Sequence, residues 1–92
     1  MHKKLIYSEI FKDSLNEIRV YVANDSVSKA DIFVDKILEK TKNLEKFPYL
    51  GSKVEKNLYQ YVVNKNYVIY YVISESNILV LYVINVKQIN FN

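Results

Sequence analysis

The sequence predicts an α+β domain in which a helical hairpin packs on one face of a small antiparallel sheet, in the order β-α-α-β-β-β. Residues 58–85 are dense in Val, Ile and Tyr, and short polar segments at 64–66 and 74–77 interrupt them. This pattern is typical of strands joined by hairpin turns. Before Pro48, apolar residues recur at helical spacing instead. We expect one domain over residues 1–92, with the second sheet face open to a partner.

The first half of the chain predicts one strand and two helices. Residues 3–7 alternate in polarity as a short strand does, and Ser8 offers a cap for a helix over 9–23. A second apolar stripe predicts a helix over 28–46, begun by Ser28 with Asp31 three residues later. A short turn between the two would make them an αα-hairpin.

The second half predicts a three-stranded meander. Pro48 and Gly51 end the helical region, and we interpret 52–57 as a charged connector. Strands are expected over 58–63, 67–73 and 78–85. The remaining segment, 86–92, is either the end of a strand or a tail.

Alternation along 67–73 assigns the two faces of the sheet. Every second residue is expected to point to the helices, and these residues are Tyr67, Ile69, Tyr71 and Ile73. The residues between them would point away, and part of the preceding strand would join them. An apolar surface of this kind needs a cover. We therefore interpret it as a partner-binding face, made of Gln60, Val62, Val68, Tyr70 and Val72.

Composition excludes several classes of function. The formal net charge of +3 is too small to identify an anionic partner, and Arg19 is the only arginine available for gripping phosphate. Without cysteine, and with His2 as the only histidine, we expect no metal site. A chain whose only glycine is Gly51 cannot form a glycine-rich phosphate loop, and we expect no cofactor. Neither a signal peptide nor a membrane span is visible, which favours a cytoplasmic protein.

Three segments carry a resemblance to a known family. They are Leu5-Ile6-Tyr7-Ser8 entering a helix, Leu44-Glu45-Lys46-Phe47-Pro48-Tyr49-Leu50-Gly51 closing the second helix, and Asn66-Tyr67-Val68-Ile69-Tyr70-Tyr71-Val72-Ile73 within the meander. In this order and spacing, the chain resembles the RelE/ParE superfamily of type II toxin-antitoxin toxins, from Lys3 to about Val86. The resemblance implies a small cytoplasmic bacterial toxin that a cognate antitoxin neutralises. Its target would be either messenger RNA in the ribosome or DNA gyrase.

Departures from the family pattern favour the ParE-like branch. Val68 stands where many members carry arginine, Gln60 and Val62 stand where nuclease members show lysines, and the last residues contain Lys87 but no arginine. Cleavage of RNA needs a base, an acid and cationic donors for the charge that builds on phosphorus. We therefore expect a non-catalytic toxin that binds a protein target such as DNA gyrase.

Two alternatives remain open at this point. One is a RelE-like ribosome-dependent mRNA endonuclease, with Lys65, Tyr70 and Lys87 as candidate catalytic residues. The other is a non-toxic relative that retains only antitoxin binding. Both a homodimer and a hetero-oligomer with the antitoxin are compatible with the sequence.

Overall fold

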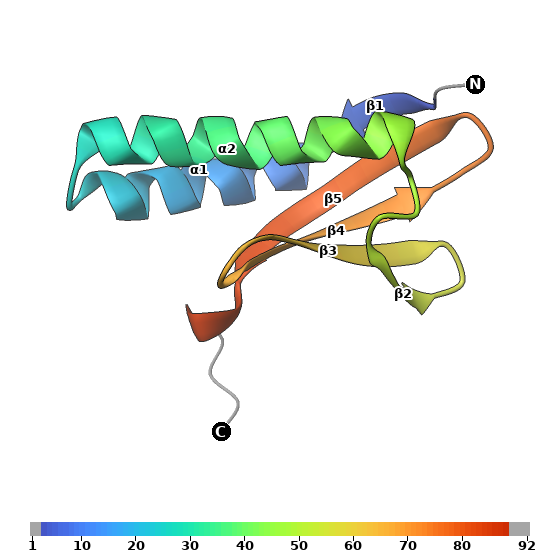
Figure 1. Cartoon of the computed structure of the whole chain (residues 1–92). Helices are drawn as coiled ribbons and strands as arrows, with labels where there is room; N and C mark the ends of the chain where they lie inside the picture. The colour runs from blue at the N-terminus through green and yellow to red at the C-terminus, as the bar shows by residue number, and fades with distance from the viewer. Residues whose placement is uncertain (1–2, 89–92) are drawn as a thin grey trace.

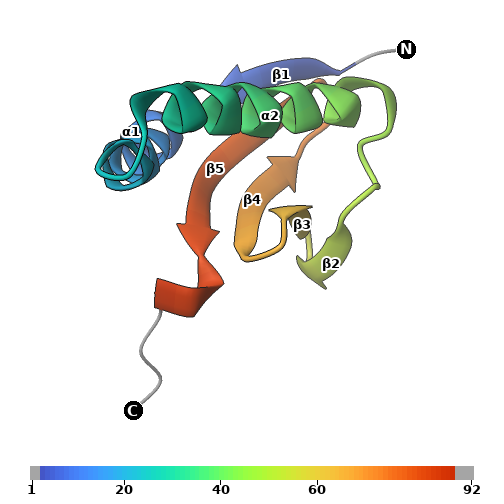
Figure 2. The same cartoon turned by 60° about the vertical axis from the view of Figure 1, so that its left-hand side comes forward.

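The computed structural model describes residues 3–88 (Figure 1). It contains two helices and five strands, followed by a 3₁₀ turn at Val86–Gln88. The elements run in the order β1 (Lys4–Tyr7), α1 (Glu9–Ala23), α2 (Val27–Lys46), β2 (Ser52–Glu55), β3 (Leu58–Asn64), β4 (Tyr67–Ile73) and β5 (Asn77–Asn85). Both helices lie on the same side of the sheet, as the view in Figure 2 also shows. The α+β class and the helical hairpin on one sheet face are thus confirmed.

A serine begins each helix. The Oγ atom of Ser8 accepts a hydrogen bond of 2.9 Å from the Phe11 N–H, which satisfies one of the unpaired donors of the first turn of α1. At α2 the expected cap was wrong, because Ser26 rather than Ser28 has the extended backbone that a cap requires. The Ser26 hydroxyl accepts from the Lys29 N–H at 3.3 Å, so the helix begins at Val27.

The sheet differs from the expected one in two ways. Its strand order is β1-β5-β4-β3-β2, with β1 parallel to β5 and all other pairs antiparallel, so the sheet is mixed. The segment read as a connector contains β2, an edge strand in which all four residues are exposed. Charged residues such as Lys53 and Glu55 are common on edge strands, where they discourage pairing with other chains, and they hid this strand in the sequence.

The core lies between the helices and the sheet. Its largest fully buried side chains include Phe11, Ile37, Leu44 and Tyr71. The Tyr71 hydroxyl donates to the Pro48 carbonyl at 2.8 Å and accepts from the Gly51 N–H at 2.9 Å, which ties the loop after α2 to the centre of the sheet. Burying this hydroxyl is acceptable only because both bonds are made.

Gly51 is required at its position by close contact rather than by an unusual backbone angle. A Cβ atom placed there would lie 2.3 Å from the Gln60 carbonyl oxygen and 2.7 Å from the Tyr71 hydroxyl. The glycine therefore lets the chain pass against β3 just where β2 begins.

Candidate functional site

The sheet face that points away from the helices, the far face, carries three rows of side chains across β3, β4 and β5. The strand register defines the rows, which are Leu58–Val72–Leu79, Gln60–Tyr70–Tyr82 and Val62–Val68–Ile84. All positions except Gln60 are aliphatic or aromatic. The far face is therefore an apolar platform with a single amide group.

The two faces of β4 follow the predicted alternation. Ile69, Tyr71 and Ile73 belong to the buried core and Tyr67 packs against it, whereas Tyr70 and Val72 are half-buried. Val68 is only 8% exposed because its neighbours on β3 and β5 flank it. Val62, near the end of β3, is 57% exposed.

Sequence reasoning missed the third strand's contribution to the far face, which is Leu79, Tyr82 and Ile84. A register shift in the β4–β5 pair, between Tyr70 and Tyr71, places one extra residue in β5. This bulge breaks the alternation that would have revealed the three residues. If the alternation along 78–85 is allowed to shift once by one residue, the sequence assigns all three to the far face.

Two tyrosine rings form the centre of the far face. The rings of Tyr70 and Tyr82 are stacked, with centroids 5.0 Å apart and planes inclined by 30°. The pair holds a flat, half-buried aromatic surface between two aliphatic rows. Surfaces that combine stacked aromatic rings with aliphatic side chains are typical of the central part of protein interfaces.

The structure brings two of the three candidate catalytic residues to the same end of the sheet. The Val86 N–H donates to the Asn66 carbonyl at 2.7 Å, so the turn that carries Lys65 lies beside the 3₁₀ turn that carries Lys87. Both lysines are exposed. Tyr70 lies further along β4, in the middle row of the far face.

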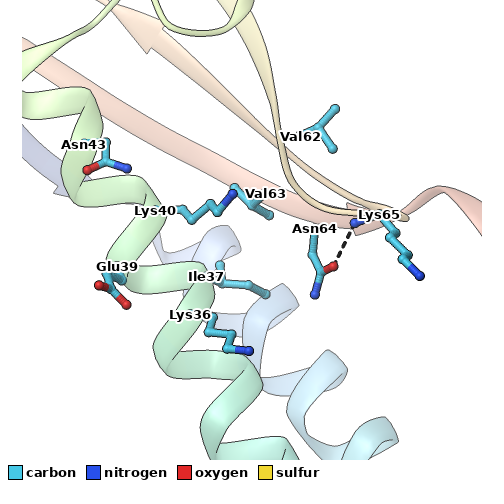
Figure 3. Close-up of a pocket in the computed structure, with 9 residues that line it drawn as sticks. All are labelled: Lys36, Ile37, Glu39, Lys40, Asn43, Val62, Val63, Asn64 and Lys65. Carbon is cyan, nitrogen blue, oxygen red and sulfur yellow. Dashed lines mark hydrogen bonds between the residues drawn. The ribbon is translucent and has the colours of Figure 1, made fainter.

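A pocket of about 620 Å³ opens between α2 and the end of β3 (Figure 3). In Figure 3, Asn64 extends toward the helix, whereas Val62 points away from it and Lys65 extends outward from the turn. The Asn64 Oδ1 atom accepts from the Lys65 N–H at 2.8 Å, which fixes the turn. The pocket is lined by Lys36, Ile37, Glu39, Lys40, Asn43, Val62, Val63, Asn64 and Lys65.

The charged pair and the shifted phenol groups of this chain lie away from the far face. Arg19 joins α1 to α2 by donating from Nε and Nη2 to the same Asp31 oxygen, at 3.2 and 2.7 Å. Burial raises the pKa of Tyr71 and of Tyr67, so both phenols keep their protons at neutral pH. Between residues 3 and 88, no group of three or more His, Cys, Asp or Glu could hold a metal ion. His2 lies outside the described residues.

No helix in the described part of the chain is long and apolar enough to cross a membrane.

Comparison with known proteins gives a family and a fold. Residues 5–89 match the model of a family described as the ParE toxin of type II toxin-antitoxin systems, parDE. A search of curated proteins found no match. Among solved structures, a chain of the chromosomal ParDE TA system from P. aeruginosa has a similar fold, with a TM-score of 0.80 and 18% sequence identity. The similarity covers 92% of this chain and 97% of that chain.

Proposed function

Because this chain belongs to the ParE toxin family of type II toxin-antitoxin systems, we propose that it arrests growth by binding a protein target, for which DNA gyrase is the candidate. We also propose that a cognate antitoxin neutralises it by covering the far face and the helical hairpin. The observation that carries this proposal is the apolar far face, in which three rows of side chains contain one amide and no cation.

Solvent exposure of this surface is unfavourable for an isolated protein. Monomeric proteins rarely expose large contiguous apolar patches, and such patches usually mark sites of interaction. Tyr70 and Tyr82 supply aromatic rings, which are enriched among the residues that contribute most to protein interfaces. A protein partner therefore fits the far face better than a nucleic acid does.

The same face is poorly suited to cleaving RNA. Removing a single preorganised donor typically lowers the rate by about a hundredfold to a thousandfold. Lys65 precedes Asn66 in the sequence and Lys87 follows Val86, and a hydrogen bond joins Asn66 to Val86. Both lysines therefore belong to turns at the end of the sheet rather than to the far face. A phosphate group over the far face would meet Tyr70 and Tyr82 without a charged donor among the rows.

An assay with purified gyrase tests the proposed target. We expect the wild-type chain to inhibit supercoiling, and we expect Tyr70→Arg to abolish most of this inhibition because it places a charge in the apolar platform. Tyr21→Arg is the matched control, since Tyr21 is 59% exposed on α1 and lies outside the far face. Unchanged inhibition by Tyr70→Arg, or equal loss in both variants, would contradict the far face as the binding site.

Expression in cells separates the remaining alternatives. Growth arrest with signs of DNA damage is the expected result, and co-expression of the cognate antitoxin should relieve it. Cleaved messages in a translating extract, lost on changing Lys65 or Lys87 to Ala, would instead establish the endonuclease. Normal growth at high levels of folded protein would indicate a non-toxic relative that only binds its antitoxin.

A further inference from the structure

The second half of β3 lacks a neighbour on its outer side. β2 pairs with β3 only from Leu58 to Gln60, and within residues 3–88 no other strand continues the pairing along 61–64. Figure 1 shows β2 beside only one end of β3. An unpaired strand edge presents backbone N–H and C=O groups that can accept an additional strand.

Two lysines of α2 border the same opening. Lys36 and Lys40 are four residues apart and therefore project from the same side of the helix into the lining of the pocket. Two positive charges at this spacing destabilise each other slightly. The ion pairs Lys12–Glu9 and Arg19–Asp31 involve neither of these lysines. Glu39 is the only acidic residue among those that line the pocket.

From these features we propose that the open edge of β3 at 61–64 receives an extended segment of a protein partner, in which acidic and apolar residues alternate. The segment adds to the sheet as a strand in line with β2. Its acidic side chains meet Lys36 and Lys40, and its apolar side chains lie beside Val62 on the far face. This inference deepens the proposed function, since it rests on a protein partner that covers the far face and names the chemistry of one of its segments.

A period of two residues explains why the two kinds of side chain alternate. Successive residues of a strand point to opposite faces of a sheet. Beside β3, one face is the lysine-lined pocket and the other is the apolar far face. Val62 lies in a row of the far face, whereas across the register shift between Val62 and Asn64 the Val63 side chain is buried and Asn64 extends toward α2 (Figure 3). An added strand must match both environments at once.

The lining favours a peptide over a nucleic acid. No aromatic ring lines the pocket on which a base could stack. Its cations are lysines, which lack the planar fork that grips phosphate with two hydrogen bonds. The backbone groups of a strand edge find matching partners in another peptide backbone but not in a phosphodiester chain.

The experiment is an NMR titration of the full chain with a soluble six-residue peptide that alternates Glu and Val. We expect shifts and slower amide exchange at 61–64, with no change along β2. A peptide that alternates Lys and Val should bind at least about tenfold more weakly, because like charges meet at the pocket.

Substitutions on α2 locate the charge effect. Changing both Lys36 and Lys40 to Glu should weaken binding of the acidic peptide by about tenfold or more. The control is Lys42→Glu, which makes the same kind of change at an exposed residue of α2 outside the pocket. It should leave the affinity within about twofold.

Several results would overturn the inference. They are the absence of shifts at 61–64 at millimolar peptide, equal binding of both peptides, equal loss in Lys42→Glu, or tighter binding of a single-stranded oligonucleotide at these residues. Concentration-dependent shifts at 61–64 without peptide would indicate a second copy of the chain instead. If gyrase inhibition depends on Tyr70 while the peptide fails to bind, the proposed function stands and only the edge inference fails.

Discussion

The two faces of β4 have similar residues and opposite environments. Tyr71 is 0% exposed under the helices and its hydroxyl has two backbone partners. Its neighbour Tyr70 points the other way and stacks on Tyr82 on the open side. Burial in this strand is therefore decided by the layer of helices that covers one face of the sheet and not by residue type. An apolar strand face without such a layer is evidence for a second protein.

The largest difference between the faces should appear on truncating these two tyrosines. Tyr71→Ala leaves a cavity in the core and removes both hydroxyl bonds, and it should lower the free energy of unfolding by roughly 3–5 kcal/mol. Tyr70→Ala should cost about 1 kcal/mol, because its site is partly open to solvent already. Urea unfolding followed by circular dichroism measures both. Equal losses would mean that the two faces are buried to the same degree.

The loop held by Tyr71 provides a second test of the helix side. Gly51→Ala introduces a Cβ atom 2.3 Å from the Gln60 carbonyl oxygen, which should destabilise the fold by roughly 1–3 kcal/mol through forced backbone movement. Ser52→Ala, at the next and exposed position, should change stability by less than about 0.5 kcal/mol. Thermal unfolding of the two variants distinguishes them, and a neutral Gly51→Ala would show that the loop is not held against β3.

Alkaline pH isolates the contribution of the Tyr71 hydroxyl. Burial raises its pKa above the ordinary value of 10.0, so the folded protein retains the phenolic proton at pH values where the unfolded chain releases it. The resulting stability is complete below pH 10 and is lost as the pH rises through the raised pKa of the folded state. Tyr71→Phe should cost roughly 1–2 kcal/mol near neutral pH.

As the pH rises above 10, the wild type should lose more stability than Tyr71→Phe. Tyr67, whose pKa burial also raises, is present in both proteins, so its effect cancels in the comparison. Parallel pH profiles for the two proteins would show that Tyr71 ionises as readily in the folded state as in the unfolded chain.

The smallest expected effect concerns the open side. A double-mutant cycle with Tyr70→Ala and Tyr82→Ala should give a coupling energy of about 0.5 kcal/mol, at the low end for an aromatic pair because the rings are half exposed. Denaturant unfolding of the four proteins measures it. A coupling as large as the loss in Tyr71→Ala would mean that the far face is itself part of the core.

Much of the fold was predictable because local patterns and tertiary environment agree. The helical spacing of Phe11, Leu15 and Ile18 follows the buried stripe of α1, and the alternation in β4 follows its two faces. Three features escaped because no local pattern encodes them. β2 is charged, the parallel pairing of β1 with β5 joins residues distant in sequence, and the α2 cap depends on the backbone of Ser26.

The site was predictable in part. Gln60, Val62, Val68, Tyr70 and Val72 do share one face, because alternation is regular along β4 and along β3 from Leu58 to Val62. The bulge in β5 hid the remaining third of the far face. The pocket beside α2 could not be foreseen, since it depends on where β2 stops alongside β3 and on how α2 crosses the sheet.

The parallel contact between β1 and β5 also sets the order of assembly during translation. Lys4 lies opposite Asn77 and Tyr7 opposite Val80, so β1 cannot take its place in the sheet until β5 has been made. Contacts between residues so distant in sequence form late and slow the search for the native state. A nascent copy in which β5 has not yet been made therefore has an unfinished sheet.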